Sequence, residues 1–165
     1  MSQTRNLVFK KIIVGCDHAA LDLKNLVVQY LKSVYASKLE AFEDAGVHTE
    51  DRVDYPDIAH QVCEKIQNKE YDGGILLCGT GIGISIAANK HEGIRAGLCH
   101  DDYSAEMTRK HNNANVLCFG GRTTGIEIAK RMVDIFLTTE FEGGRHADRL
   151  EKLKLTACAS SSCQQ

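Results

Sequence analysis

The sequence lacks several features that mark large classes of protein. Its 165 residues contain one proline and no apolar run that approaches the roughly 18 residues of a membrane-spanning helix. Its 20 basic and 22 acidic side chains give a net charge of −2, which argues against a dedicated nucleic-acid-binding protein. Residues 1–9 lack the apolar segment of a signal peptide, so we expect a cytoplasmic protein.

Cysteine and histidine are present, but without the spacings that metal sites require. The seven cysteines form no C-x-x-C pair, and their odd number and irregular spacing fit neither a zinc ribbon nor a secreted disulfide framework. The seven histidines show no H-x-H or H-E-x-x-H spacing, so no metal is expected. Several cysteines lie in or at the end of apolar runs, namely Cys16, Cys78, Cys99 and Cys118. Reduced thiols in a cytosolic core are the simplest interpretation.

Short apolar runs alternate with helical patterns along the chain. Strands are predicted over 11–16, 73–78, 94–99 and 116–119, with a weaker strand near 42–45. Helices are predicted over 21–34, 56–69 and 146–155, and from the glycine-rich segment 79–83 to residue 90. Two more are predicted from Asp101 or Asp102 to 111, and from a capping box at Thr124–Glu127 to 137. This alternation predicts a three-layer, doubly wound α/β fold, in which helices cover both faces of a mostly parallel, five-stranded sheet. Residues 1–155 form one expected domain, and 156–165 an expected flexible tail.

The segment after the 73–78 strand gives the strongest local signal for chemistry. Ligands of such folds bind beyond the carboxyl ends of the strands, where Gly79, Gly81 and Gly83 alternate with larger residues. This spacing lets backbone N–H groups approach an anion at the N-terminus of the next helix. The loop matches neither the dinucleotide fingerprint nor the Walker A motif, so we expect a negative ligand other than a nucleotide. A tight turn without a ligand is the alternative.

Other side chains near the same sheet edge have both a functional and a structural interpretation. Cys78 precedes the helix N-terminus, a position that favours a reactive thiolate, although a buried structural cysteine is the alternative. Asp17 is a candidate helix cap, and His18 either a phosphate ligand or an exposed histidine. Arg122 follows two glycines at a strand end.

A second group of candidates lies later in the chain. Arg145 and Arg149 share one helix face and suit a phosphate, or form a solvated basic face. His111 and Asn112 end a helix, where both residue types are ordinary.

These residues resemble, in order, the type B ribose-5-phosphate isomerases, of the family shared with galactose-6-phosphate isomerase subunits. The resemblance runs from about Lys11 to Leu155. Its markers are Gly15–His18, Asp54-Tyr55-Pro56, Asp72–Lys90, Gly93–Ala96, Arg109–Asn112, Gly121-Arg122 and Glu142–His146. It implies interconversion of ribose 5-phosphate and ribulose 5-phosphate with no metal or organic cofactor.

The resemblance also implies a catalytic assignment. One branch of the family uses a cysteine at the position of Cys78 as the base that moves a proton between C2 and C1. The other branch uses a glutamate at the position of Ile84, which cannot accept a proton, so this chain resembles the cysteine branch. Thr80 would support the base, His111 would open the sugar ring, and Asp54 is a possible helper. The backbone of Gly79, Thr80, Gly81, Ile82 and Gly83 would bind the enediolate.

The remaining implied contacts hold the sugar and its phosphate. Asp17, Tyr55 and Asn112 would border the sugar, and His18, Arg122, Arg145 and Arg149 would bind the 5-phosphate. The resemblance further implies a homodimer, or a dimer of dimers, whose sites are shared between subunits.

Three alternatives remain open from the sequence. A hexose-6-phosphate isomerase acting on galactose or allose phosphate would need more room near residues 36–55 and His100. A phosphosugar sensor would have no need of Cys78 as a base. A thiol redox enzyme would need Cys16 or Cys99 to approach Cys78.

Overall fold

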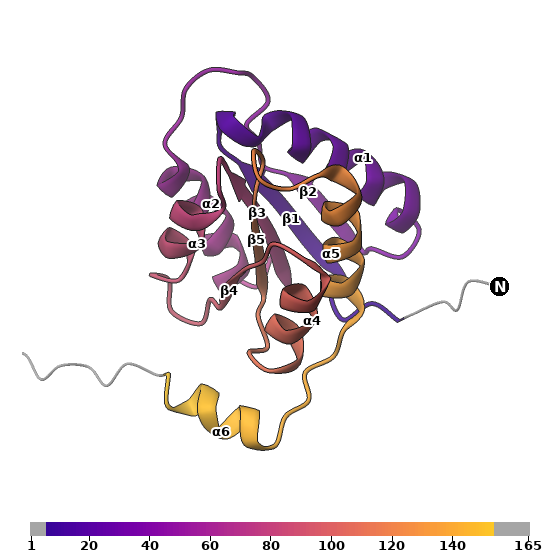
Figure 1. Cartoon of the computed structure of the whole chain (residues 1–165), viewed down its shortest axis with the longest axis vertical. Helices are drawn as coiled ribbons and strands as arrows, with labels where there is room; N and C mark the ends of the chain where they lie inside the picture. Colours follow the sequence, from indigo (N-terminus) through magenta and orange to yellow (C-terminus); the bar gives the residue numbers. More distant parts are fainter. Residues whose placement is uncertain (1–5, 154–165) are drawn as a thin grey trace, which may run out of the picture.

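Five parallel strands form a single sheet at the centre of the computed structural model, which describes residues 6–153 (Figure 1). The strands are β1 (Lys11–Cys16), β2 (Ala41–Asp44), β3 (Gly73–Cys78), β4 (Ala96–Leu98) and β5 (Val116–Gly120). They lie in the order β2-β1-β3-β5-β4, so the chain leaves β1 in both directions. The predicted doubly wound sheet is confirmed, and all four pairings are parallel. The topological switch point, where such folds bind ligands, lies between β1 and β3.

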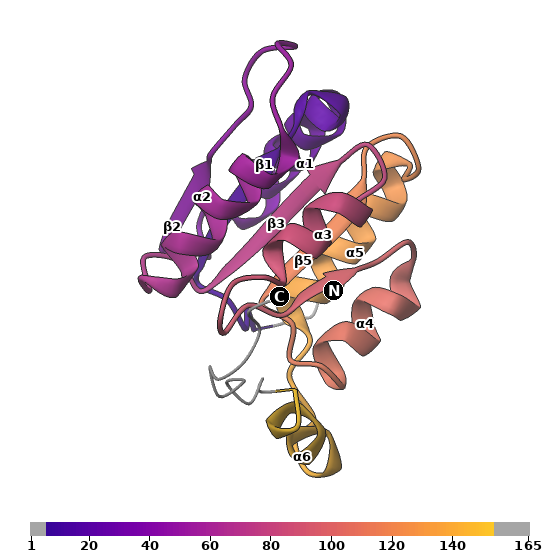
Figure 2. The same ribbon diagram turned by 90° about the vertical axis from the view of Figure 1, so that its left-hand side faces the viewer.

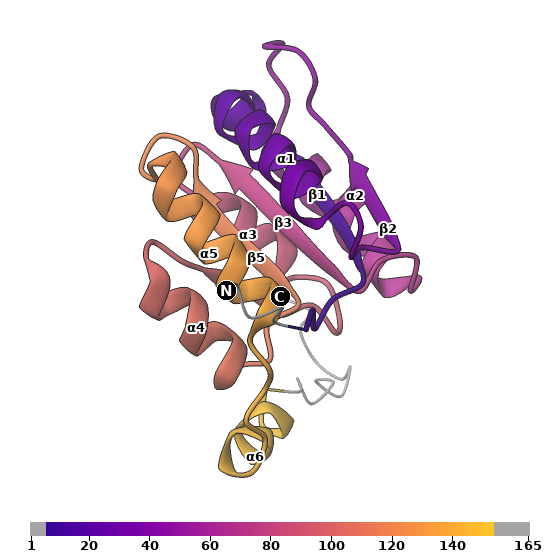
Figure 3. The ribbon, with the colours of Figure 1, turned by 90° about the vertical axis from the view of Figure 1, so that its right-hand side faces the viewer.

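Helices cover both faces of this sheet. They are α1 (Leu21–Tyr35), α2 (Tyr55–Gln67), α3 (Ile82–Ala88), α4 (Asp102–Lys110), α5 (Ile126–Thr138) and α6 (Arg145–Glu151), with a 3-10 turn over His18–Ala20. Figure 2 shows α2 and α3 in front of one face, and Figure 3 shows α1 and α5 in front of the other. α6 lies apart from these layers, at the end of the molecule opposite to the strand arrowheads.

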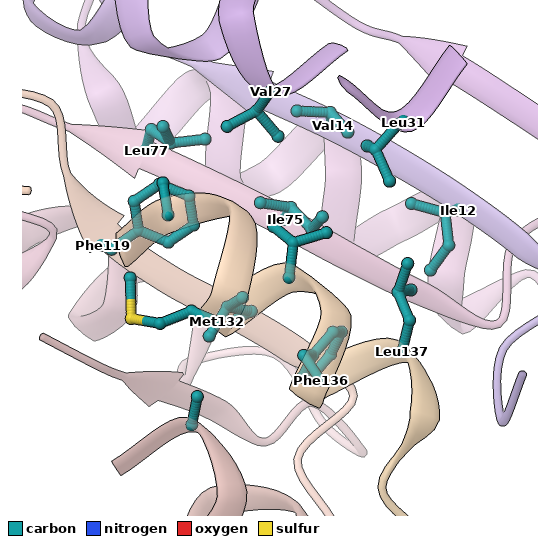
Figure 4. Packing of buried hydrophobic residues seen from close by; sticks show 14 of the residues in the cluster. Ile12, Val14, Val27, Leu31, Ile75, Leu77, Phe119, Met132, Phe136 and Leu137 are labelled. Carbon is teal, nitrogen blue, oxygen red and sulfur yellow. The ribbon is translucent and has the colours of Figure 1, made fainter. Parts of the chain in front are cut away.

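Two hydrophobic cores lie on the two sides of the sheet. The central strands β3 and β5 are buried along their whole length, because helices cover both of their faces. On β3, Ile75 and Leu77 point to the core under α1 and α5, whereas Leu76 and Cys78 point to the core under α2 and α3. Figure 4 shows the first of these cores, where Phe119 and Phe136 pack with aliphatic side chains from the strands. Cys78 therefore belongs to the core while it ends β3.

Two details of the predicted elements were wrong. The strand expected over 94–99 is limited to residues 96–98. The capping box expected at Thr124–Glu127 does not form, since Gly125 is the N-cap of α5 and no side chain caps it. The buried hydroxyl of Thr124 has no hydrogen-bond partner.

The predictions for the C-terminal end of the chain lie partly outside the described residues. The last helix covers 145–151, and the predicted tail over 156–165 lies beyond the residues that the structure describes. Among residues 6–153, no helix combines the length and the apolar character needed to cross a membrane.

Candidate active site

Cys78 stands at the carboxyl end of β3, beside the switch point of the sheet. It is 4% exposed, and its Sγ accepts a hydrogen bond from the N–H of Gly81 at 3.2 Å. This donor lies in the turn that leads directly into α3, so the sulfur faces the backbone N–H groups of the glycine loop. The loop thus places the Cys78 sulfur beside the backbone N–H groups at the start of α3, and a role for either in catalysis or anion binding stays a prediction.

Close backbone approach explains the glycines of this loop. Gly81 has φ of +80°, and a Cβ built on it would lie 2.7 Å from the backbone of Phe119. A Cβ on Gly120 would lie 2.7 Å from the backbone of Thr80. The N–H of Gly121 also donates to the carbonyl of Cys78 at 2.8 Å. The ends of β3 and β5 therefore hold each other at a spacing that side chains would not permit.

Asp17 and Arg122 reach the same edge from β1 and β5. Asp17 is 7% exposed and accepts from the N–H of Ala19 at 3.0 Å, which confirms its capping role. Burial raises the pKa of this carboxyl, while the Ala19 N–H and the charges of His18 and Arg122 act against the rise. The Arg122 side chain crosses Gly79, since a Cβ there would lie 3.8 Å from Arg122 Cδ.

His18 and Arg122 share a hollow at this edge. It measures about 440 Å³ and is also lined by Glu50 and Gly121. The His18 ring is held through Nδ1, which lies 3.3 Å from the carbonyl oxygen of Val53. The wall of the hollow therefore carries one imidazole and one guanidinium, together with the carboxylates of Asp22 and Glu50.

Asp54 and Tyr55 begin α2 next to the glycine loop. The Tyr55 ring lies over Gly83, where a Cβ would come within 2.7 Å of Cζ. Asp54 is the N-cap residue, yet its exposed carboxylate makes no capping hydrogen bond. Both side chains are therefore available to a ligand at this edge. We call Asp17, His18, Asp54, Tyr55, residues 78–83 and Arg122 the carboxyl-edge cluster.

The other predicted residues lie at the opposite edge of the sheet. α4 runs back from the carboxyl end of β4, so His111 and Asn112 follow it at the amino edge, before β5 begins at Val116. β5 ends at Gly120, the partner of Cys78, and its length at about 3.3 Å per residue separates the two edges by about 13 Å. Cys78 and His111 of one chain therefore do not meet.

His111 is the centre of a second group of polar side chains. Its ring stacks on that of His146, with centroids 4.2 Å apart and planes inclined by 7°. Glu142 Oε2 lies 3.7 Å from His146 Nε2, and Arg145 Nε lies 3.5 Å from the same nitrogen. Burial lowers the pKa of His146, as do the charges of His111, Arg145 and Arg149. We call residues 111, 112, 142, 145, 146 and 149 the amino-edge cluster.

The amino-edge cluster has the ligand atoms for a metal but a charge that favours an anion. His111, Glu142 and His146 offer atoms that all lie within 4.8 Å of one another. Lys110, however, also reaches Glu142 at 3.8 Å, and the charges of Arg145 and Arg149 act on His146. Lys110, Arg145 and Arg149 together outnumber the carboxylates of Glu106 and Glu142, so the arrangement suits a phosphate better than a cation.

Sequence reasoning missed Arg109, Glu142 and His146 as individual functional or positioning residues. Arg109 is 2% exposed, and its guanidinium donates to the carbonyls of Thr139 and Ala114 and to the side chain of Asn113. It thereby fixes the turn that carries His111. All three lie within marker segments of the resemblance, which was the available signal, but their buried contacts are long-range and leave no pattern in the chain.

The cysteines that the structure describes are reduced, as expected. The five cysteines within residues 6–153 are buried free thiols. Burial raises the pKa of Cys16 and of Cys99 to about 11 each, so neither is a reactive thiolate near neutral pH.

Comparisons with known proteins show the family of this chain. Residues 12–153 match the model of the family described as Ribose/Galactose Isomerase. The ribose-5-phosphate isomerase B of Escherichia coli is 48% identical over 144 residues, which cover 87% of this chain and 94% of that protein. A D-erythrulose-4-phosphate isomerase of Pectobacterium atrosepticum is 44% identical over 86% of this chain and 91% of its own.

Solved structures are similar over nearly the same span. A ribose 5-phosphate isomerase of Thermotoga maritima superposes with a TM-score of 0.80 at 50% identity, covering 86% of this chain and 95% of the other. Ribose-5-phosphate isomerase B of Clostridium thermocellum gives a TM-score of 0.81 at 46% identity, covering 86% and 93%. The chain therefore belongs to the Ribose/Galactose Isomerase family.

Proposed function

We propose that this protein interconverts ribose 5-phosphate and ribulose 5-phosphate through an enediolate, with Cys78 as the base and no metal or organic cofactor. The observation that carries the proposal is Cys78 itself. Its sulfur lies at the switch point of the sheet, against the N–H of Gly81, in a chain of the sugar isomerase family. The five buried free thiols support a reducing, cytoplasmic setting.

The carboxyl-edge cluster performs the proton transfer. Cys78 removes the C2 proton and returns it to C1, a step that needs a base within hydrogen-bond reach of both carbons. The N–H groups of residues 79–83 stabilise the enediolate oxygens, and one such donor is worth about 3–4 kcal/mol of barrier. Thr80 Oγ1 accepts from the N–H of Ile82 at 3.3 Å, which leaves its hydroxyl proton for the O1–O2 side of the sugar. Ile84 is fully buried and takes no part.

The amino-edge cluster of a second subunit completes the site. His111 opens the sugar ring as acid and base, with Asp54 as a helper, because an imidazole titrates near neutral pH. Asn112, Asp17 and Tyr55 contact the sugar. The 5-phosphate is bound by His18 and Arg122 on one subunit and by Arg145 and Arg149 on the other. The opposite-edge positions of Cys78 and His111 support this division.

Exposed apolar side chains support a homodimer. Ile82 and Ile86 share one face of α3 and are 50% and 57% exposed, and Tyr103 on α4 is 70% exposed. Large apolar side chains in such exposed positions are typical of an interface between subunits. Ile82 directly follows the glycine loop, so a second chain on this face of α3 would border the carboxyl-edge cluster.

The first experiment measures isomerase activity on ribose 5-phosphate in EDTA for the wild type and for Cys78→Ala. We expect activity in the wild type and a loss of at least about 1,000-fold in the folded variant, because the substitution removes the proposed base for the C2 proton. Activity in the variant would show that another residue is the base. Inactivity of the wild type would favour a phosphosugar sensor, which the sequence also allows.

The second experiment tests the shared site by mixing two inactive variants, Cys78→Ala and His111→Ala. In a heterodimer, one site loses both residues and the other keeps both. After denaturation and refolding of an equal mixture, about one quarter of the wild-type activity should return. No return of activity would place both residues in a site within one chain.

Other phosphosugars are the second candidate substrates. The similarity to a D-erythrulose-4-phosphate isomerase favours testing a tetrose phosphate. Galactose and allose 6-phosphates test the hexose alternative. We expect the highest kcat/KM with ribose 5-phosphate, and a higher value for any other sugar would reassign the substrate but keep Cys78 as the base.

A further inference from the structure

Two histidines face each other on the α2 and α3 side of the sheet, apart from both clusters. His60 lies in the middle of α2, and His91 in the turn after α3. Nδ1 of His60 is 2.6 Å from Nε2 of His91, and the ring centroids are 4.9 Å apart. Two nitrogens at this distance must share one proton, because two lone pairs or two N–H groups would repel each other.

A chain of hydrogen bonds decides which nitrogen carries that proton. Gln67 donates through Nε2 to the carbonyl of Glu92 at 2.8 Å, so its Oε1 is turned toward His91. His91 Nδ1 lies 3.1 Å from this oxygen and donates to it. Nε2 of His91 therefore carries a lone pair, and His60 donates to it. Outer partners that fix an imidazole in this way are characteristic of histidine metal ligands.

The surrounding charge suits a cation. Glu64 lies one turn after His60 on α2, so the two side chains share a helix face. The charged groups that act on the titration of His91 are His60 and Glu64. This contrasts with the amino-edge cluster, where the positive charges of Lys110, Arg145 and Arg149 outnumber the carboxylates of Glu106 and Glu142. A divalent ion would therefore bind at the histidine pair in preference to the His111 cluster.

We propose that His60 and His91 bind a divalent transition-metal ion such as Zn²⁺, with water in the remaining positions and the charge of Glu64 nearby. Binding moves the His60 proton from Nδ1 to Nε2 or to solvent, so that both facing lone pairs coordinate the ion. Zn–N bonds of about 2.0–2.1 Å in a tetrahedral site hold the nitrogens about 3.3 Å apart. The rings must separate by about 0.7 Å, a change that the exposed His60 side chain can make.

A bound ion would join α2 to the turn after α3. The N-terminal ends of these two helices carry Tyr55 and the glycine loop, which pack against each other at Gly83. Because the ion binds the folded chain and not the unfolded one, it raises the thermal unfolding midpoint as its concentration exceeds the dissociation constant. The site does not depend on the isomerase activity, so its test is independent of the proposed function.

Calorimetric titration of the metal-free protein with ZnCl₂ tests the proposal. We expect one ion per chain, and a loss of at least about tenfold in affinity in His60→Gln and in His91→Gln. Gln67→Ala, which removes the orienting oxygen but no ligand, should weaken binding about tenfold. His48→Gln, at an exposed histidine elsewhere, should bind as the wild type does. Unfolding midpoints in EDTA check that each variant is folded. If His91→Gln does not fold, the affinity of His60→Gln tests the proposal, because the His60 side chain is exposed.

Three outcomes would overturn the proposal. The first is an absence of binding at millimolar ZnCl₂. The second is binding that survives both histidine substitutions and disappears in Glu142→Gln, which would assign the ion to the amino-edge cluster. The third is binding that disappears only in Cys78→Ala, which would assign it to the thiol. Co²⁺ absorption separates the last outcome, since thiolate ligation adds a charge-transfer band that imidazole ligation lacks.

Discussion

The two clusters of candidate residues are positioned by different means. The carboxyl-edge cluster is positioned by backbone, because the ends of β3 and β5 approach so closely that only glycine fits at residues 81 and 120. The amino-edge cluster is positioned by side chains, through the His111–His146 stack and the buried guanidinium of Arg109. The proton-transfer chemistry that we propose needs sub-ångström placement, and the sheet supplies it. Ring opening and a part of the phosphate binding are assigned to the amino-edge cluster, which helix ends and long side chains hold.

The largest effect is expected from a substitution in the carboxyl-edge cluster, which the backbone positions. Gly81→Ala places a methyl group 2.7 Å from the Phe119 backbone at a φ of +80°. The loop must move, and Cys78 loses its N–H donor, so we expect kcat/KM for ribose 5-phosphate to fall at least about 100-fold.

Two matched glycines separate the causes of that loss. Gly93 shares a positive φ of +76° but has no atom near its Cβ, and Gly125 has neither feature. Gly93→Ala should cost about 1 kcal/mol of stability with activity retained, and Gly125→Ala should leave activity unchanged. Wild-type activity in Gly81→Ala would mean that the loop adjusts and that close approach does not set the site.

The next largest effect is expected from a substitution beside the amino-edge cluster, which side chains position. Arg109→Met removes the donors to the carbonyls of Thr139 and Ala114 and leaves these buried acceptors without partners. Burial lowers the pKa of Arg109 to about 10, so the guanidinium is charged at neutral pH and its loss is felt there. We expect the free energy of unfolding in urea to fall by about 3 kcal/mol. Lys130→Met, which breaks an exposed ion pair with Glu127, should change it by less than about 0.5 kcal/mol.

The same contrast explains what the sequence could predict. The existence of five strands, their parallel pairing and the helix after the glycine loop follow from local apolar runs and from residues adjacent in the chain, and these were confirmed. The position of Asp17 as a cap is equally local. The Thr124–Glu127 capping box failed although its pattern was correct, because Gly125 occupies the cap position and the Thr124 side chain turns inward.

Contacts between distant segments were not predictable in this way. His111 and His146 stack across 35 positions of sequence, and Arg109 reaches Thr139 across 30. Neither contact leaves a periodic signal, because each depends on how α6 and the segment before it fold back onto the end of α4. The separation of Cys78 from His111 likewise follows from strand order, which local patterns do not determine.

A smaller effect concerns the histidine stack. The pKa of His146 is lowered in the folded chain by burial and by His111, so the unfolded chain binds a proton more readily. The free energy of unfolding should therefore fall as the pH drops below about 6.5, the ordinary histidine value. In His146→Gln this fall between pH 7 and pH 5 should be smaller, measured by urea midpoints at both values. His48→Gln, at an exposed ring, should keep the wild-type fall, and an unchanged fall in His146→Gln would show that the stack does not resist protonation.

The smallest effect compares two helix-capping aspartates with opposite pKa shifts. Burial raises the pKa of Asp17, whereas the N–H and hydroxyl of Ser104 lower the pKa of Asp101. A raised carboxyl pKa means that stability falls as the pH rises through the range of that group. A lowered one means that stability is present above the ordinary carboxyl value, near 3.9, and is lost as the pH falls through it.

Asparagine caps a helix about as well as aspartate, so substitution at either position isolates the charge. Asp17→Asn should leave the urea midpoint at pH 7 unchanged or slightly raised, and Asp101→Asn should lower it. The change in the urea midpoint differs in sign because the Asp17 carboxylate is buried beside Arg122, whereas the Asp101 carboxylate is exposed and only caps α4. A lower midpoint in Asp17→Asn would mean that the Asp17 charge stabilises the folded chain. Stability alone would then explain the buried acid at the switch point, without the proposed sugar contact.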